Sequence, residues 1–504
     1  MDRKNNLLKI VGLSLALVVM VLVQGSPGFA QSTEPQSQPP AQTPEVQQLK
    51  ERLQSLEETV KVLKDQITSM EARKSSPPAI VQATYSSPAS SPGFAGPDYA
   101  PAAGTSPNPQ DPKGESTFEV YGFAMLDAGY QVKQNDPDWF DVVRPTKLPR
   151  FDNQFAPNGN TYFGVRQSRL GVKSSTPTKY GELKTQFEFE LFGTGAQAGQ
   201  TIFRLRHAWG ELGQFGAGQQ NSTFMDGDVF PNTIEYWGPN GMVLFRNVQF
   251  RWMPLRGRNA LSIALERPGA SADQGNFADR IQLQGVRPHF SLPDLTANFR
   301  WTRNWGHVQV AGLFKRIAWE DTVNDGLDLK RTGENGTTVD DLDLTGSAIG
   351  GGLNITSALK FGENSTGKFA FVFGQGIQNY MNDADVDVGV QTNLAAGNPR
   401  RPIVGKALPM WSFIAYLDHN WSKRWSSSFG YSMMTVDNSN GQAADAYRRG
   451  HYASGNLLYY PWENVLMGGE FIWGRRENFL DGFKSDDFRF QFSFKYNFSK
   501  KWTF

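Results

Sequence analysis

Aromatic and polar residues alternate strictly near the C-terminal end of the chain. Even positions are aromatic and odd positions are polar or charged: Phe488, Phe490, Phe492, Phe494, Tyr496 and Phe498 alternate with Asp487, Arg489, Gln491, Ser493, Lys495 and Asn497. Successive side chains of a strand point to opposite faces, so the pattern predicts a strand with one apolar and one polar face. A half-buried strand of a soluble sandwich also alternates. Six aromatic positions on one face favour instead a strand of an outer-membrane β-barrel, with lipid outside and water inside.

Similar alternating segments recur from Thr117 onward, for example Leu183 to Leu191. Short turns, such as those at Thr176–Pro177 and Gly213, alternate with long polar loops, such as 132–160 and 221–242. Outer-membrane barrels have short periplasmic turns, long external loops and even strand numbers. The pattern therefore predicts an all-β fold: a sixteen-stranded antiparallel transmembrane β-barrel over residues 117–504, with both ends on the short-turn side.

The end of the chain carries two further signals. Asn420–Trp425 recurs in similar form as Asn497–Trp502, and both segments place aromatics beside cations, as expected at a membrane interface. We therefore expect the last strand to end near Phe498. The terminal Phe504 resembles the signal by which barrels are recognised for insertion, and we expect it to act in assembly.

Four segments precede the predicted barrel. Residues 1–30 are typical of a signal peptide, with Arg3, Lys4 and Lys9 before an apolar run that ends in small residues. An uncleaved anchor is the alternative, but the apolar run is short for a membrane span. Residues 31–44 form a short polar segment. Residues 74–116 are rich in Pro, Ser, Ala and Gly and predict a flexible linker.

Residues 45–73 carry a heptad pattern. Positions a hold Val46, Leu53, Val60 and Ile67, and positions d hold Leu49, Leu56, Leu63 and Met70. This spacing predicts an N-terminal coiled-coil helix, because a lone amphipathic helix would leave the apolar stripe in water. The β-branched a positions favour two strands, whereas the segment from Arg52 to Glu57 resembles a short motif associated with trimers. We expect a parallel trimer.

Composition excludes several functions. Lys and Arg number 50 against 49 Asp and Glu, so no net charge points to nucleic acid. Cysteine is absent, which excludes disulfides, thiolate metal sites and a lipid-modified N-terminus. The five histidines have no metal-ligand spacing, and no catalytic triad or phosphate-binding loop stands out. We expect no enzyme activity and no cofactor.

Arginines are the candidate functional residues. Arg204 and Arg206 share one strand face, Arg246 and Arg251 flank another strand, and Arg166 marks a third. Arginine facing lipid is costly, so we expect these side chains in the lumen, where guanidinium groups favour anions. The alternative is that they pair with Glu182, Glu188 and Glu190 and merely stabilise the wall.

The loop from Gln219 to Met242 contains four aromatics and two prolines, unlike the other loops. An exposed loop rarely needs so many aromatics, so we expect this one to fold inward after the fifth strand and constrict the channel. Its carboxylates are Asp226, Asp228 and Glu235. We expect them opposite Arg204, Arg206 and Arg246.

One stretch resembles a known family. Phe203–Gly213 and the run from Gln219 through Asp226 to Asn247 are similar to segments of the DcaP-like outer-membrane porins. The coiled coil before the barrel also matches that family. The resemblance implies a homotrimer of sixteen-stranded channels for small anions, with dicarboxylates as substrates.

These observations predict a trimeric porin of the Gram-negative outer membrane, in contact with outer-membrane lipid, that lets small anionic solutes diffuse. Its coiled coil would lie in the periplasm. A phosphate- or sugar-selective porin is one alternative. Another is a structural barrel anchor, which links the outer membrane to peptidoglycan through the coiled coil.

Overall fold

The computed structural model describes residues 114–269, 281–283, 286–321, 343–393, 397 and 401–504. The predicted signal peptide, polar segment and coiled coil, and all but the last three residues of the linker, lie outside the described residues, so these assignments stay predictions. No helix among the described residues is both long and apolar enough to span a membrane.

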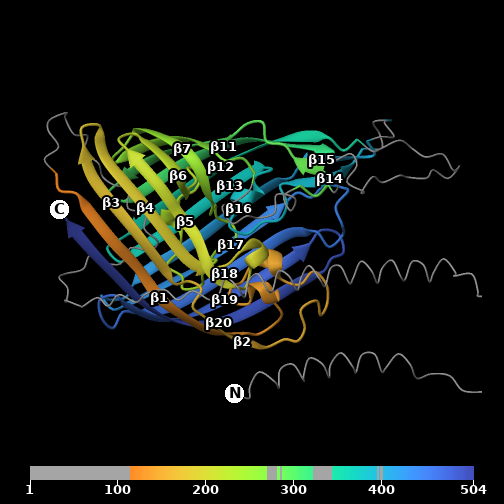
Figure 1. Cartoon of the computed structure of the whole chain (residues 1–504). Coiled ribbons are helices and arrows are strands. Elements are labelled where there is room, and N and C mark those ends of the chain that lie inside the picture. Colours follow the sequence, from red (N-terminus) through yellow and green to blue (C-terminus); the bar gives the residue numbers. More distant parts are fainter. Residues whose placement is uncertain (1–113, 270–280, 284–285, 322–342, 394–396, 398–400) are drawn as a thin grey trace, which may run out of the picture. The chain divides into compact units, whose positions relative to one another are not determined.

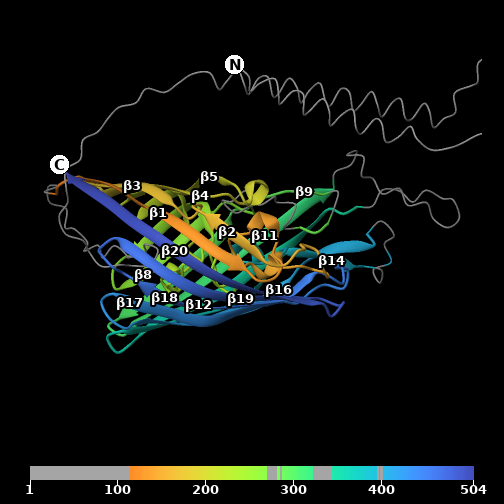
Figure 2. The same ribbon diagram turned by 90° about the horizontal axis from the view of Figure 1, so that it is seen from below.

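The described residues form one large antiparallel sheet that closes on itself (Figures 1 and 2). Its strands are β1 (Thr117–Gln131), β2 (Asn160–Gly164), β3 (Arg169–Thr178), β4 (Gly181–Phe192), β5 (Thr201–Leu212), β6 (Phe215–Asn221), β7 (Arg246–Leu255), β8 (Asn259–Glu266), β9 (Val286–Pro288), β10 (Asp294–Arg303), β11 (Gly306–Asp321), β12 (Gly346–Phe361), β13 (Ser365–Gln375), β16 (Pro409–Asn420), β17 (Trp425–Val436), β18 (Tyr447–Tyr459), β19 (Val465–Asn478) and β20 (Lys484–Thr503). Pairing of β1 with β20 closes the barrel.

Two barrel strands are each split into two segments. β2 and β3 both pair with β1, and β9 and β10 follow one another along the same side of β11. Counting each pair once gives sixteen barrel strands in the described part of the chain, which confirms the predicted fold.

A bulge explains the first split. Asp127 of β1 pairs with Gly164, and Phe123 pairs with Arg169. Between these pairs β1 has three residues and the partner strand has four, so the partner has one extra residue. The extra residue interrupts the ladder, as bulges do. The hydroxyl of Ser168 partly restores it by accepting a hydrogen bond from the Met125 amide at 3.0 Å.

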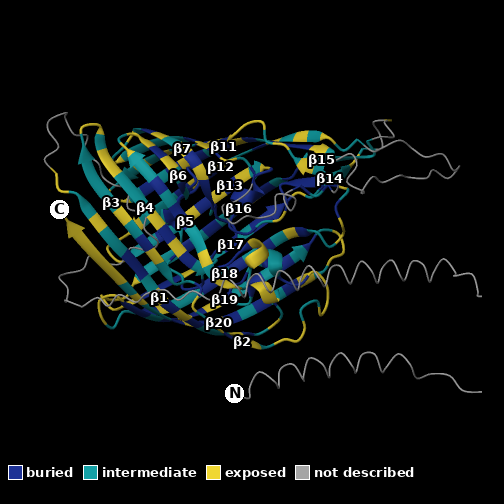
Figure 3. Ribbon diagram, viewed as in Figure 1, coloured by how far each residue is buried: buried dark blue, intermediate teal, exposed yellow. Residues whose placement is uncertain are grey.

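Buried and exposed residues alternate along the strands, as the sequence pattern predicts (Figure 3). On β20, Phe490 and Phe492 are 57% and 51% exposed, whereas Arg489 and Gln491 are buried. The apolar side chains therefore form the outer, lipid-facing surface, and the polar ones face the interior.

The structure corrects three details. β20 continues beyond Phe498 to Thr503, because β1 begins at Thr117 and supplies a partner for each residue; Ser116 and Phe504 even exchange two backbone hydrogen bonds. The first short turn lies between Thr178 and Gly181, not at Thr176–Pro177. The loop 193–200 between β4 and β5 is too short for the sequence pattern to reveal.

Three loops fold into the barrel interior: 132–159, 222–245 and 376–387. They carry short 3₁₀ helices at Pro137–Trp139, Pro145–Lys147, Gly227–Val229 and Gln378–Tyr380. Another described 3₁₀ helix, Gly195–Gln197, lies between β4 and β5. Phe224, Phe245 and Tyr380 pack in one apolar cluster with inward-facing Leu313 and Met410 of the wall. The hairpin of β14 (Val388–Thr392) and β15 (Ile403–Ala407) follows the third loop, at the end of the barrel away from the C-terminus (Figure 1).

Candidate functional site

The loop of residues 222–245, which we call the constriction loop after its expected role, follows the fifth barrel strand and folds into the barrel interior. Near its start, buried Asp226 accepts hydrogen bonds from Thr356 at 2.6 Å and His307 at 2.8 Å, and lies 3.4 Å from Arg300. Burial alone would raise the pKa of Asp226, but the hydrogen bond from His307 and the charge of Arg300 lower it. The carboxylate therefore ties the loop to β10, β11 and β12.

The middle of the constriction loop crosses to the far wall. The Phe230 carbonyl accepts from Lys368 of β13 at 2.5 Å, the Asn232 amide donates to Asp418 of β16 at 3.2 Å, and the Ile234 amide donates to Glu470 of β19 at 2.8 Å. These bonds provide partners for backbone groups that would otherwise be buried without them.

Tyr236 then brings the constriction loop back to β4. Its ring stacks on Phe192 with centroids 3.9 Å apart and planes 8° apart. Its hydroxyl donates to Glu190. Burial raises the pKa of Tyr236, which keeps this hydroxyl a proton donor at neutral pH.

Glu190 belongs to a charged cluster that we call the arginine wall: Arg169 of β3, Glu188 and Glu190 of β4, Arg204 and Arg206 of β5, and Arg246 of β7. Strand register assembles it, because Glu190 pairs in register with Arg169 on one side and with Arg204 on the other. All six side chains are at most 16% exposed. Four guanidinium groups and two carboxylates leave a net charge of +2 among the described residues of this cluster.

Pairing within the arginine wall is uneven. Arg206 lies 2.6 Å from a carboxylate oxygen of Glu188 and 2.6 Å from one of Glu190. Arg246 approaches Glu190 only to 3.9 Å, and its Nε has no hydrogen-bond partner among the described residues. The alternative of wall-stabilising pairs therefore holds for Arg206, while Arg246 keeps spare donor capacity.

The other predicted arginines hold loops and turns. Arg166 contacts Asp141 at 2.5 Å and the Gly193 carbonyl at 2.8 Å. Arg251 donates to the Asn221 carbonyl at 2.5 Å, and its guanidinium lies 5.1 Å from the Trp209 ring centroid. Neither belongs to the arginine wall.

The loop carboxylates lie elsewhere than expected. Asp226 and Asp228 contact Arg300 of β10, which we did not single out from the sequence, although it alternates there with outward-facing Phe299 and Trp301. Glu235 accepts hydrogen bonds from Val143 and Tyr452 instead. The expectation that all three face the arginine wall is therefore wrong in its geometry, because none forms an ion pair with an arginine of that wall.

Asp226, Asp228 and His307 place three potential metal ligands within 4.8 Å of one another. Arg300 contacts both carboxylates and donates to Nδ1 of His307 at 3.0 Å, so the second ring nitrogen is the one that donates to Asp226. The guanidinium supplies the positive charge that a metal ion would bring, and the residues do not fit a metal site.

The three inward loops also contact one another at a junction that the sequence did not predict. The Arg144 guanidinium lies against the rings of both Trp139 and Trp237, 4.2 and 4.1 Å from their centroids, and its Nε lies 2.9 Å from Asp383. Trp237 donates to the Asn382 carbonyl at 2.7 Å. Trp237, Asn382 and Asp383 come from parts of the sequence distant from Arg144, so no local pattern marks this junction.

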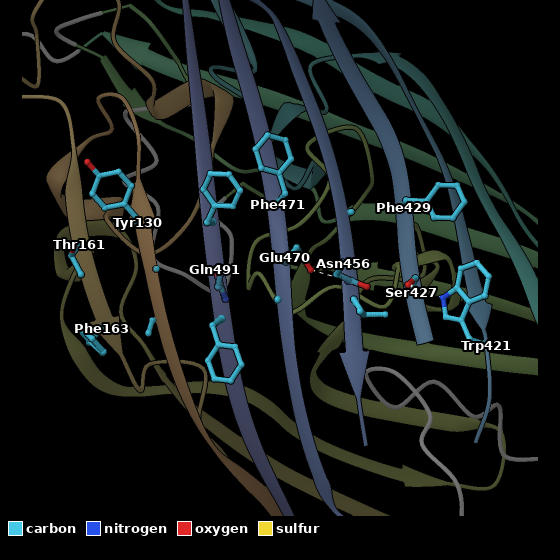
Figure 4. Close-up of a pocket in the computed structure, with 17 residues that line it drawn as sticks. Tyr130, Thr161, Phe163, Trp421, Ser427, Phe429, Asn456, Glu470, Phe471 and Gln491 are labelled. Atoms are coloured by element: carbon cyan, nitrogen blue, oxygen red, sulfur yellow. Dashed lines mark hydrogen bonds between the residues drawn. The ribbon is translucent and has the colours of Figure 1, made fainter. Parts of the chain in front are cut away.

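The hollow in Figure 4 lies on the outer face of the barrel, across β17 to β20, β1 and β2, with Trp421 of the turn before β17 at its edge, and has a volume of about 850 Å³. Exposed aromatics such as Phe163, Phe429 and Phe490 line it. Its aromatic lining belongs to the lipid-facing surface, and the inward-facing Glu470 and Gln491 lie beneath it.

Comparisons with known proteins agree with this architecture. The family model described as DcaP outer membrane protein matches residues 112–386, more than half of the chain. No curated protein matches. Among solved structures, the outer membrane channel DcaP of Acinetobacter baumannii superposes with a TM-score of 0.61 at 18% identity, over 76% of this chain and 97% of that one. An anion-selective porin from Comamonas acidovorans gives a TM-score of 0.46 at 10% identity, over 76% and 100%. The family match confirms the resemblance noted in the sequence: the chain belongs to the DcaP family of outer-membrane channel proteins.

Proposed function

We propose that this channel lets small anions, with dicarboxylates as the main class, diffuse across the outer membrane, and that it works as a homotrimer. The net charge of +2 on the arginine wall, next to the constriction loop, is the observation that carries the proposal. A coiled coil in the periplasm would hold the three chains together.

The chemistry of the arginine wall suits carboxylates. Guanidinium groups present planar pairs of N–H donors that match a carboxylate, and they stay charged at every physiological pH. Arg206 is engaged by Glu188 and Glu190, whereas Arg246 approaches Glu190 only to 3.9 Å, so Arg246 carries much of the excess charge. Two excess positive charges match the two negative charges of a dicarboxylate.

The test is the reversal potential of the purified protein in a planar bilayer under a salt gradient. We expect an anion-selective wild type. Arg246→Gln removes one of the two excess charges. At roughly 5 Å in water this charge changes the energy of a passing ion by about 0.8 kcal/mol, favourably for an anion and unfavourably for a cation, so its loss should lower the anion/cation permeability ratio about 15-fold. Arg424→Gln, in the exposed turn between β16 and β17, is the matched control and should leave the ratio unchanged.

The outcomes separate the alternatives. A cation-selective wild type, or an Arg246→Gln variant with unaltered selectivity, would refute the assignment. A barrel that is folded but never conducts would favour the structural anchor. Block of the ion current by inorganic phosphate or a neutral sugar, and not by succinate, would favour a phosphate- or sugar-selective porin.

A further inference from the structure

The constriction loop is attached to the wall at Ile234 through a set of carboxylates. The Ile234 amide donates to Glu470 of β19 at 2.8 Å. The Ile234 carbonyl accepts from the side-chain amides of Gln167 at 2.8 Å and Gln491 at 3.1 Å. Both amides also donate to Asp127 of β1, at 2.9 and 3.3 Å. Asp127 and Glu470 thus hold the two sides of one peptide segment.

The next residue adds a third carboxylate. Glu235 accepts hydrogen bonds from the Gly238 amide at 2.5 Å, the Val143 amide at 3.1 Å and the Tyr452 hydroxyl at 3.2 Å. It therefore joins the constriction loop to the loop 132–159 and to β18. We call Asp127, Glu235 and Glu470 the carboxylate latch.

The carboxylate latch is buried and lacks counter-ions. Its three residues are 4%, 2% and 3% exposed, and none forms an ion pair with a described lysine or arginine. One oxygen of Glu470 has no hydrogen-bond partner among the described residues. Figure 4 shows the other oxygen bonded to Asn456 of the neighbouring strand, at 2.9 Å.

The surrounding charges do not balance the latch. The titratable and charged groups that face it are Asp141, Tyr162, Tyr416, Tyr452 and Arg489. Asp141 is paired with Arg166. Arg489 donates to Gln131 and to the Phe140 and Val142 carbonyls rather than to the latch. Three carboxylates and one guanidinium would leave a net charge of −2 if all three carboxylates ionised.

We propose that the carboxylate latch is a proton-controlled device: it holds the constriction loop against β18 to β20 when protonated, and releases the Ile234–Glu235 segment when ionised. A buried carboxylate without a cation is destabilised by the loss of water around its charge. Release of the segment exposes Glu235 to water and restores hydration of the charge.

The direction of the pH effect follows from Glu235. Burial raises its pKa from 4.5 to about 7, because the hydrogen bonds from Gly238 and Val143 and the charge of Arg489 only partly offset the loss of water. The docked loop then binds the proton more tightly than the released loop. Docking is therefore strongest below about pH 4.5 and is progressively lost as the pH rises through about 7.

A single introduced thiol can report this docking, because the chain has no cysteine. Thr233 precedes Ile234, and its hydroxyl is buried without a hydrogen-bond partner among the described residues. In full-length Thr233→Cys protein, we would measure the rate of modification by a charged, water-soluble methanethiosulfonate at pH 5 and pH 8. Dividing by the rate for Asn364→Cys, in the exposed turn between β12 and β13, corrects for the ionisation of the thiol itself.

We expect the normalised rate to rise at least tenfold from pH 5 to pH 8. Adding Glu235→Gln and Glu470→Gln, which keep the shape but remove the charge, should abolish this rise. Adding Glu363→Gln, in the exposed turn, should leave it unchanged. Heat-modifiable migration of every variant verifies that the barrel is folded.

Two results would overturn the proposal: a normalised rate that does not change with pH, or a rise that persists in the double Gln variant. The measurement needs no ion current, so its outcome does not depend on whether the channel prefers anions.

Discussion

Arg206→Gln and Arg246→Gln each remove one positive charge from the arginine wall, but they should differ sharply in their effect on the free energy of unfolding. Arg206→Gln breaks contacts of 2.6 Å with both Glu188 and Glu190, which are 5% and 0% exposed. Loss of one partner from a buried ion pair costs about 3–5 kcal/mol, because the remaining charge stays buried and unpaired. Arg169 remains 3.5 and 3.7 Å from the two carboxylates, so we expect a value near the lower end, about 3 kcal/mol.

Arg246→Gln should cost much less. Its ion pair with Glu190 is 3.9 Å long, and its charge repels the neighbouring Arg204 and Arg206. Removing a like charge relieves that repulsion, so we expect the free energy of unfolding to change by less than about 1 kcal/mol. The two variants should therefore differ by about 2 kcal/mol or more.

The assay is urea unfolding of each variant in lipid vesicles, followed by the fluorescence of the 13 tryptophans. Both variants lose one positive charge from the same cluster, so their reversal potentials should shift in the same direction. Equal unfolding free energies would refute the reasoning, since they would mean that the uneven pairing has no energetic consequence. A lower stability for Arg246→Gln than for Arg206→Gln would refute it more strongly.

Two further predictions concern assembly. Deleting Phe504, whose ring is 77% exposed at the end of the closing pair of strands, should lower the amount of folded barrel in the membrane while the surviving channels keep their conductance; unchanged yield would contradict this role. A peptide of residues 45–73 should sediment as a trimer, and Arg52→Ala should weaken its association; a dimer in the ultracentrifuge would contradict the trimeric coiled coil.

The barrel could be predicted from the sequence because its signals are local. Alternation along a strand such as 487–498 identifies both faces, and the contrast between short turns and long loops gives the strand number. The interruption after Gly164 left no clear mark, because a bulge adds a single residue to a pattern that the wall otherwise maintains. The end of β20 was placed too early because Phe498–Trp502 resembles a turn, whereas the register with Thr117 extends the strand.

The candidate site could be predicted only in part. Arg204 and Arg206 were found because two cations at alternate positions of a strand share a face. Whether Glu188 and Glu190 lie beside these arginines depends on the register between β4 and β5. That register includes a bulge beside Glu188 and could not be deduced from the sequence. Arg300 and Arg144 contact residues more than 70 and more than 230 positions away, so their roles depend on how the loops fold inside the barrel.

The two charged clusters meet in the constriction loop. Glu235 belongs to the carboxylate latch, and the adjacent Tyr236 donates to Glu190 of the arginine wall. Movement of Ile234 and Glu235 away from β19 must therefore strain or break the contact between Tyr236 and Glu190, because one peptide unit separates the two side chains. Glu190 without that hydroxyl attracts its arginines more strongly, which lowers the positive potential available to a passing anion. Proton-dependent docking of the loop would in this way adjust both the width of the passage and its preference for anions.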